Sequence, residues 1–333
     1  MIRKIRNIVI ALVFIPVIGV KAQDFHLSMY DAAPIYLNPA MTGLFEGSWR
    51  LHAQYRDQWR AVNFKPYNTA LLSFDASYKK WGFGVQFANY RAGAGNFNIF
   101  QGLLSVAYNV PLGAKKAHNL AFGVQGGVTN KSVQYQLLTF DNQYTTANGG
   151  GFDQTMPSGE VFDVQSRYTP IVNFGMLYYF SKQESRLNPF VGVSAFNLIN
   201  PNESFFGDKA KYPFRFYGHA GVRINITELF YIVPKVLVMN QDKFFEQTYA
   251  LDLGYYISSS DLYLLGGLVY RNADAMVFSL GLKISNITAK FAYDVNMSRL
   301  TNTSSGKGAY EISLTYVFSK KKRKEYEKIC PRL

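Results

Sequence analysis

Few residues in this chain could carry out covalent or metal chemistry. The sequence contains four histidines, His26, His52, His118 and His219, and one cysteine, Cys330. A metal site or an activated nucleophile needs such residues grouped with carboxylates or with one another, and none of these histidines is spaced in that way. We therefore predict a protein that is not an enzyme, with no catalytic residue, no metal site and no cofactor.

His52 belongs to a segment whose side chains alternate in character. Over residues 49–58, apolar or aromatic side chains take every second position, and Arg50, His52, Gln54 and Arg56 lie between them. Because successive side chains of a strand point to opposite faces, this strand would have one apolar face and one basic face. Its length suits a tilted crossing of a bilayer, which needs about 9 to 11 residues. Lipases built on membrane β-barrels need a histidine near the lipid-facing side. His52 instead lies on the polar face, which argues against this kind of catalysis.

Residues 1–22 have the features of a secretory signal peptide. Three basic residues precede an apolar run over 8–20, and cleavage is expected before Gln23. An N-terminal membrane helix is a weaker interpretation, because the run is short and Pro16 interrupts it. The exported chain would keep Cys330 as its single cysteine, so no internal disulfide can form.

The composition of the rest of the chain indicates a membrane protein without a spanning helix. Apolar residues make up 48% of the sequence and charged residues only 17%. Beyond the signal peptide, no apolar run approaches the roughly 18 residues of a membrane helix, and the longest, 229–239, contains Pro234 and Lys235. A closed barrel, in which strands satisfy each other's backbone groups, is the other structure that can span a bilayer.

The alternating pattern recurs and predicts an all-β fold, an antiparallel outer-membrane β-barrel of about fourteen strands over residues 49–318. Counts of twelve or sixteen strands also fit, because predicted boundaries are uncertain by two to four residues. The candidate strands are 49–58, 67–78, 81–91, 99–110, 119–131, 170–180, 188–198, 214–225, 229–239, 247–258, 262–271, 275–284, 287–297 and 309–318.

Connections of different length alternate between these candidates. Short turns such as 79–80 and 285–286 follow even-numbered strands, whereas the longest connections, 132–169 and 199–213, follow odd-numbered strands. Outer-membrane barrels have short periplasmic turns and longer outside loops. The alternation therefore places the long loops at the cell surface and both ends of the barrel domain in the periplasm.

Residues 23–48 do not alternate, and they contain the turn-like pair Asn38-Pro39. We expect a plug-like, irregular but ordered segment that closes the periplasmic mouth or enters the lumen, because an unpaired polar segment cannot lie in hydrocarbon. Asp24, Asp31 or backbone carbonyls of this segment would be bound by basic residues at the first strand. The predicted docking residues are Arg50, Arg56 and Arg60.

The same segment resembles the start of a known family. Asn38-Pro39-Ala40 and Gly43, followed by a first strand with Tyr55 and Arg56, are similar to the beginning of the PorP/SprF family of Bacteroidota outer-membrane proteins. Segments 194–205, 270–274 and 308–316 resemble later parts of that family. Where the family often has Ser-His before a glutamate, this chain has Ala309-Tyr310 before Glu311.

The resemblance implies a component or partner of the type IX secretion system in the outer membrane. Members of the family associate either with periplasmic secretion-machinery proteins and peptidoglycan-linked lipoproteins, or with a particular secreted adhesin. The implied partners are thus a secreted protein with a type IX C-terminal domain, these periplasmic proteins, and outer-membrane lipid. A passive porin or hydrophobic-solute channel with an N-terminal plug is the alternative, and single-channel conductance separates the two.

Two long loops contain aromatic residues beside glycine and asparagine. Loops longer than about 12 to 15 residues usually carry function or are disordered, and disordered segments are poor in aromatic residues. Tyr and Phe supply contact area with few rotatable bonds, which suits protein binding. We therefore expect an exported partner to dock here, and the alternative is that these side chains fold inward and gate the barrel. The candidate residues are Tyr144, Phe152, Phe205, Phe206 and Tyr212.

The positive charge of the chain is concentrated at its C-terminal end. Residues 319–333 contain seven Lys or Arg and two Glu, out of a formal net charge of +13 for the whole sequence. This concentration marks a periplasmic tail and not a nucleic-acid surface. The tail is either simply solvated or docks an acidic periplasmic partner through Lys320, Lys321, Lys322, Arg323 and Lys324.

Overall fold

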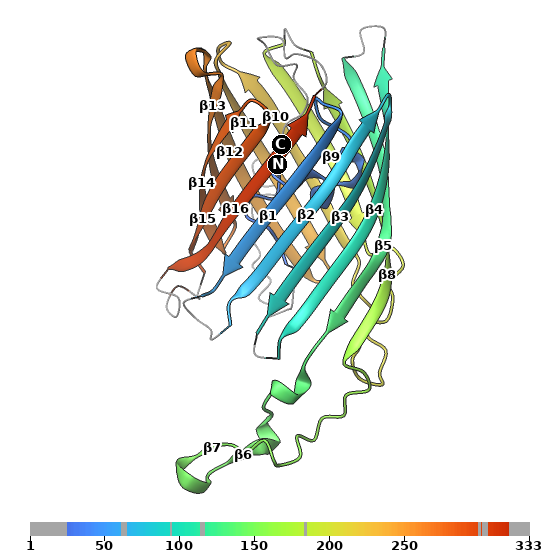
Figure 1. The fold of residues 1–333 in the computed structure, drawn as a ribbon, viewed down its shortest axis with the longest axis vertical. Helices are drawn as coiled ribbons and strands as arrows, with labels where there is room; N and C mark the ends of the chain where they lie inside the picture. Colours follow the sequence, from blue (N-terminus) through green and yellow to red (C-terminus); the bar gives the residue numbers. More distant parts are fainter. Residues whose placement is uncertain are drawn as a thin grey trace, which may run out of the picture.

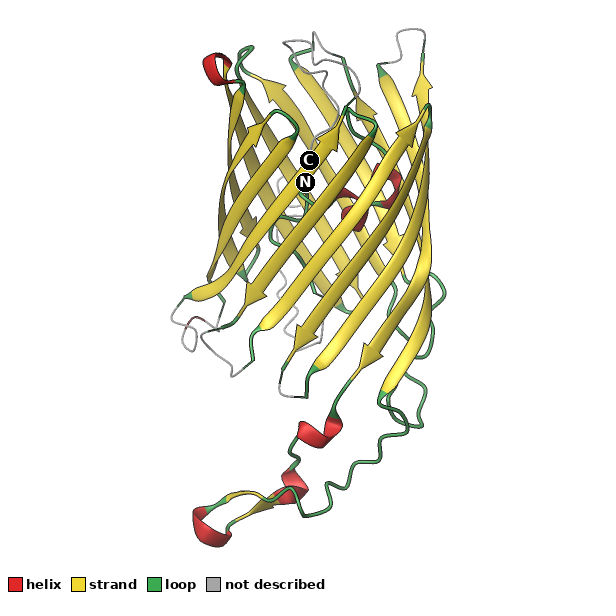
Figure 2. Ribbon diagram, viewed as in Figure 1, coloured by secondary structure: helices red, strands yellow, loops and turns green. Residues whose placement is uncertain are grey.

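Long antiparallel strands make up most of the protein (Figure 2). The computed structural model describes residues 25–60, 65–93, 95–113, 117–182, 185–298, 301 and 306–319. The predicted signal peptide, Asp24 and Lys320 to Lys324 lie outside these residues. The barrel strands are β1 (Trp49–Gln58), β2 (Tyr67–Tyr78), β3 (Trp81–Ala92), β4 (Phe97–Leu112), β5 (His118–Ser132), β8 (Ser166–Phe180), β9 (Leu187–Phe196), β10 (Arg215–Asn225), β11 (Phe230–Gln241), β12 (Phe244–Ile257), β13 (Leu262–Arg271), β14 (Ala275–Ile284), β15 (Ile287–Asn296) and β16 (Lys307–Phe318).

These fourteen strands form one closed barrel, in which the first strand pairs with the last (Figure 1). β1 pairs with β2 on one side and with β16 on the other, from Trp49 opposite Phe318 to Gln58 opposite Ala309. The predicted fold class and strand number are therefore confirmed. The largest boundary difference is in β8, which begins at Ser166 and not at residue 170, because it pairs with β5 as far as Ser132.

The two faces of the strands separate as the alternation predicts. In β1, Leu51 and Tyr55 are exposed on the outer surface, whereas Arg50, His52 and Gln54 are buried inside the barrel. Pro234 lies in the middle of β11 without breaking it. The β10 ladder has no paired residues opposite Val233 and Pro234, so the missing N–H of the proline leaves no broken ladder bond on that side.

The connections differ between the two ends of the barrel (Figure 1). We call the end with the connections β2–β3, β12–β13 and β14–β15 the short-turn end, and the opposite end the long-loop end. The connection from β5 to β8 projects far beyond the long-loop end and carries the small hairpin of β6 (Tyr144–Thr145) and β7 (Gly151–Phe152). One connection there is shorter than predicted, because β11 and β12 extend until only Asp242 and Lys243 separate them.

One seam of the barrel is shorter than the strands that form it. β8 contains fifteen residues, all of which pair with β5 on one side. On its other side, β8 pairs with β9 only from Phe174 to Tyr179. The part of β8 nearest the long-loop end, Ser166 to Asn173, therefore has a strand neighbour on one side only.

Residues 25–48, which we call the plug, lie inside the barrel and contain the short helix α2 (Pro34–Leu37) and the 3-10 turn η1 (Pro39–Met41). Leu37 and Met41 belong to one buried apolar cluster with wall residues such as Leu177 and Leu237. The apolar core of this protein is thus formed where the plug packs on the inner wall.

Among the described residues, no helix is long and apolar enough to cross a membrane.

Candidate functional site

Four wall glycines allow the plug to approach the strands closely. A Cβ atom on Gly123 of β5 would lie 2.3 Å from the carbonyl carbon of Pro39, and one on Gly175 of β8 would lie 2.0 Å from Oδ1 of Asn38. A Cβ on Gly82 of β3 would lie 2.0 Å from the carbonyl oxygen of Thr42. Gly192 of β9 similarly makes room for the side chains of Asn38 and His219. Glycine inside a strand often marks such a close approach, and here it forms a seat for Asn38 to Gly43.

Asn38 anchors the plug in this seat. Its side chain is fully buried, and its Nδ2 donates to the carbonyl oxygens of Met176 at 3.1 Å and Val193 at 3.2 Å. Its Oδ1 accepts from the backbone N–H of Ala40 at 2.9 Å and so caps η1. Nε2 of His219 lies 3.2 Å from Nδ2. One amide thus joins the plug turn to both β8 and β9.

A buried group of charges holds the start of the plug. Glu311 of β16 accepts the backbone N–H groups of Ser28 and Met29, both at 2.8 Å. Arg56 pairs with Glu311 at 3.2 Å and with Asp294 of β15 at 2.9 Å, and it also contacts the Ser28 hydroxyl. The hydroxyl of Ser28 donates to Asp294 at 2.6 Å. Charge-assisted bonds of this kind are stronger than neutral ones, so the plug is tied to three strands here.

A second cluster of buried charges surrounds Asp31 of the plug. Lys235 of β11 pairs with Asp31 of the plug and, at 2.6 Å, with Asp252 of β12. Although burial alone would raise the pKa of the Asp31 carboxyl, the Lys235 ammonium holds that pKa well below its usual range. Lys235 thus lies between a plug carboxylate and a wall carboxylate and joins the plug to β11 and β12.

The end of the plug is held at the short-turn end of β1 and β2. Arg50 binds Asp75 of β2 through two bonds of 2.9 and 2.8 Å, and Asp75 also accepts the backbone N–H of Gly43 at 2.7 Å. Nη2 of Arg50 lies 3.4 Å from the carbonyl oxygen of Met41. The plug is therefore fixed along its whole described length.

The three arginines predicted to dock the plug divide into two groups. Arg50 contacts a backbone carbonyl and Arg56 contacts Ser28, so both touch the plug. Arg60 instead pairs with Asp57 and its side chain is 70% exposed, because it lies just beyond β1 at the long-loop end. Of the partners expected for these arginines, a backbone carbonyl is contacted by Arg50, whereas Asp31 pairs with Lys235 from the opposite wall.

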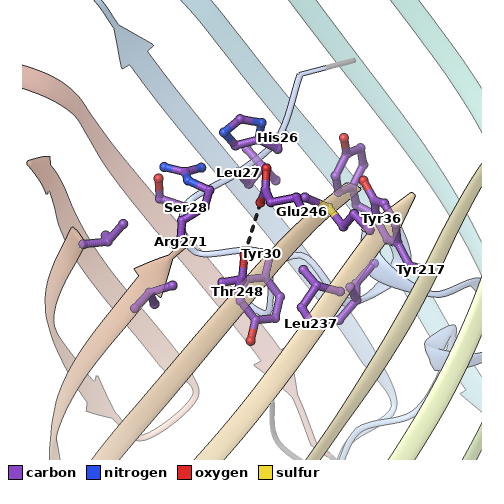
Figure 3. Close-up of a pocket in the computed structure, with 14 residues that line it drawn as sticks. His26, Leu27, Ser28, Tyr30, Tyr36, Tyr217, Leu237, Glu246, Thr248 and Arg271 are labelled. Carbon is purple, nitrogen blue, oxygen red and sulfur yellow. Dashed lines mark hydrogen bonds between the residues drawn. The ribbon is translucent and has the colours of Figure 1, made fainter. Parts of the chain in front are cut away.

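Little space remains between the start of the plug and the wall. In Figure 3, His26, Ser28 and Tyr30 lie among Leu237, Glu246 and Arg271, and the dashed line marks the bond from Thr248 to Glu246. This space is about 10 Å³, near the lower limit for a single water molecule. Burial, together with the nearby Arg271 and Arg56, lowers the pKa of His26 well below its usual range, so His26 is neutral.

A larger cavity lies between the plug and the wall at the short-turn end. It measures about 150 Å³ and is bounded by plug residues such as Leu44 and by Lys283, Asn286 and Lys290 of the wall and its turn. Within the described part of the chain, no group of three or more His, Cys, Asp or Glu is placed to hold a metal ion.

The aromatic residues predicted to bind a partner occupy different positions. Tyr144 and Phe152 face each other across the β6–β7 hairpin with ring centroids 5.4 Å apart, and both side chains are about half exposed. Phe206 is also exposed and packs on Phe162 at 4.8 Å. The ring of Phe205 is partly buried and lies 6.3 Å from that of Phe97.

Tyr212 does not belong to this exposed set, which corrects the prediction from sequence. Only 4% of Tyr212 is exposed, and it packs with Leu103 and Ile171 of the inner wall. The ammonium of Lys131 lies 3.7 Å from its ring centroid. The alternative in which loop aromatics fold inward therefore holds for this one residue.

Several residues of the site were not predicted from the sequence. The anchoring role of Asn38 and the pairs made by Lys235, Asp252, Asp294 and Glu311 depend on strands far apart in the sequence. These four charged residues lie on the lumen faces of otherwise apolar strands. Buried charges need partners, so their presence in the sequence could have indicated ion pairs inside the barrel.

Comparison with known proteins adds two findings. A family model described as type IX secretion system membrane protein PorP/SprF matches residues 19–316. No curated protein matches the chain.

Solved structures match the chain at the level of the fold. The Ralstonia pickettii toluene transporter TbuX is 11% identical, with a TM-score of 0.50 over 86% of this chain and 94% of that one. A deletion mutant of the monoaromatic hydrocarbon channel TodX is 11% identical, with a TM-score of 0.50 over 85% and 93% of the two chains. The monoaromatic hydrocarbon channel CymD is 13% identical, with a TM-score of 0.49 over 86% and 93%.

Proposed function

Since the chain belongs to the PorP/SprF family of type IX secretion system membrane proteins, we propose that it is a non-enzymatic binding component of that system. It lies in the outer membrane, and its long-loop end faces the cell surface. There it receives an exported protein through that protein's C-terminal domain and anchors it or assists its export. The partner is held by non-covalent contacts.

The observation that carries this proposal is the distribution of contacts between the two ends. The plug fills much of the lumen and is bonded to strands around the wall, from β1 and β2 to β8, β11, β15 and β16. The connection between β5 and β8, residues 133–165, instead extends into solvent with exposed aromatic side chains. We call this connection the excursion. A barrel with an occupied lumen and a projecting aromatic loop suits binding of a protein better than passage of a solute.

The alternative function is a passive channel for a small or hydrophobic solute. It predicts a large and steady open pore in the purified protein. The solved channels share the fold with this chain, but at 11% identity the likeness extends no further than the fold. Weak or absent single-channel conductance of the native protein would support the binding function.

The loop aromatics provide the first test of partner binding. Because Tyr144 and Phe152 contact each other at the tip of the excursion, changing both to serine removes apolar contact area without opening the barrel core. We expect the exported partner to be lost from the barrel purified under mild conditions, as we also expect when residues 141–158 are shortened or Phe205 and Phe206 are changed to serine.

The matched control is Tyr78→Ser, which removes an exposed aromatic side chain at the short-turn end. Each variant must first show the heat-resistant gel mobility of a folded barrel. Full recovery of the partner with every loop variant would place the interface elsewhere and would contradict this proposal.

The basic tail provides a test at the other end of the barrel. β16 ends at the short-turn end, so the tail leaves the barrel on the side that we assign to the periplasm. We propose that Lys320, Lys321, Lys322, Arg323 and Lys324 dock an acidic periplasmic protein of the secretion machinery. Changing all five to glutamine should weaken co-purification of that protein, and the native interaction should weaken as salt rises, because exposed charges are screened. Equal recovery of the variant and the native protein at low salt would leave the tail as a solvated end.

A further inference from the structure

The short seam between β8 and β9 leaves a strand edge without a strand neighbour. Val172 directs its carbonyl toward that side, where it accepts the backbone N–H of Leu198 at 2.9 Å. Backbone groups of a strand alternate between its two sides, so Ser166, Tyr168 and Pro170 direct their backbone groups the same way. Within the described residues, none of these three forms a backbone hydrogen bond on that side.

The sequence of this edge agrees with its lack of a strand neighbour. Pro170 has no N–H to donate, and prolines within sheets are largely restricted to edges and bulges. Arg167 and Thr169, which face the lumen, direct their backbone groups toward β5, and that ladder is complete. Unpaired edges tend to recruit another strand, and they are especially unfavourable close to lipid.

The neighbouring loop, residues 199–213, contacts the lumen side of the wall. After Leu198 the chain passes on the lumen side of the wall, because Glu203 pairs with Lys131 and Tyr212 packs on Ile171, whose side chains face the lumen. In the same loop, the carbonyl of Phe205 accepts the N–H of Asp163, just before β8, at 2.9 Å. Between the bonds at Val172 and Asp163, the described residues therefore give this edge no backbone hydrogen-bond partner.

The side chains around the edge indicate what could fit it. On the outer face, Tyr168 is 74% exposed, and Leu198, which bonds to Val172, and Ile199 after it are also exposed. On the lumen face, Nε of Arg167 is buried and has no hydrogen-bond partner among the described residues. A strand with apolar side chains outward and a hydrogen-bond acceptor inward would satisfy both faces.

We propose that the edge of β8 from Ser166 to Pro170 accepts one extended strand of the exported partner. Main-chain hydrogen bonds to this edge would supply affinity, and the alternation of the partner strand would supply specificity. An aspartate, glutamate, asparagine or glutamine of that strand would accept from Arg167. The inference rests on the proposed function, because it assumes that an exported protein binds at the long-loop end.

The variant Tyr168→Pro tests the backbone pairing directly. It removes the one N–H that points to the open side at this position, and it leaves the β5 ladder intact because Arg167 and Thr169 serve that ladder. The matched control, Tyr168→Thr, removes the ring but keeps the N–H. We expect Tyr168→Pro to reduce partner recovery about fivefold or more, in line with the loss of a main-chain hydrogen bond, and Tyr168→Thr to retain most of it.

The outcomes separate this inference from the proposed function. If both variants keep the partner while the Tyr144→Ser, Phe152→Ser variant loses it, strand addition is wrong and surface binding stands. If the loop variants and Tyr168→Pro all keep the partner, both proposals are wrong. Equal loss with proline and threonine would also overturn the inference, because it would identify a side-chain contact.

Cross-linking covers the case in which Tyr168→Pro does not fold. Tyr168→Cys in a Cys330→Ser background should form a cross-link to the exported partner with a short thiol reagent. Cross-linking only to a second copy of the barrel would overturn the inference, because the edge would then serve self-association.

Discussion

Gly123→Val is expected to displace the plug from its seat and to raise the single-channel conductance of the barrel. The new Cβ would lie 2.3 Å from the carbonyl carbon and oxygen of Pro39 and 2.4 Å from the nitrogen of Ala40. These are backbone atoms on a short turn, so no side chain can rotate to relieve the overlap. Overpacking of this kind usually costs about 1 to 3 kcal/mol, and the plug can avoid it by leaving the wall. Single-channel recording of the purified protein in planar bilayers measures the result.

A control for this experiment lies three residues further along the same strand. Gly126 points to the outer surface, and the nearest atom to a Cβ there would be the carbonyl oxygen of Ile171 at 3.7 Å. Gly126→Val should therefore fold and conduct like the native protein. If Gly123→Val has native conductance and its plug resists protease as in the native protein, the glycine seat does not hold the plug. A large open pore already present in the native protein would instead favour the solute channel.

Arg56→Met is expected to cause a large loss of barrel stability. The Arg56 side chain is almost fully buried, as are its partners Asp294 and Glu311. Methionine keeps much of the volume but leaves two carboxylates without their shared cation, although Arg271 still contacts Asp294 at 3.0 Å. Removing one partner of a buried ion pair typically costs about 3 to 5 kcal/mol. Urea unfolding of the barrel in lipid vesicles measures this free energy.

Arg60→Met is the matched control, since it removes an arginine just beyond the same strand. Arg60 makes one ion pair with Asp57 and is mostly exposed, so its loss should cost no more than about 1 kcal/mol. Arg56→Lys keeps the charge but not the forked geometry that reaches both carboxylates. Its loss of unfolding free energy should lie between those of Arg56→Met and Arg60→Met. Equal effects of Arg56→Met and Arg60→Met would show that the buried charge group does not stabilise the fold.

The barrel follows from local sequence patterns. The alternation in β1 predicts which side chains face lipid, and β1, β2, β13 and β14 have the predicted bounds. Periodicity is sufficient for this purpose, because each strand must present an apolar face to lipid regardless of its neighbours. The length of the excursion between β5 and β8, and its aromatic residues Tyr144 and Phe152, are likewise visible in the sequence.

The plug contacts required the tertiary structure. From sequence, residues 23–48 are expected to dock near Arg50, Arg56 and Arg60, but the path of an irregular segment depends on which walls it meets. Asp31 meets Lys235, which is 204 positions away in the chain. Pairing between such distant residues is set by barrel closure, and single-sequence periodicity carries no information about it.

The sequence by itself determined the class of protein, the strand pattern, the separation of the two faces and the loops exposed to solvent, because each depends on short-range alternation or composition. The tertiary structure alone decided that Tyr212 is buried, that Arg60 does not contact the plug, and that β8 has an edge without a strand neighbour. These features depend on strand register and on how far each strand extends beside its neighbour. Both are fixed when the whole barrel closes around residues 25–48.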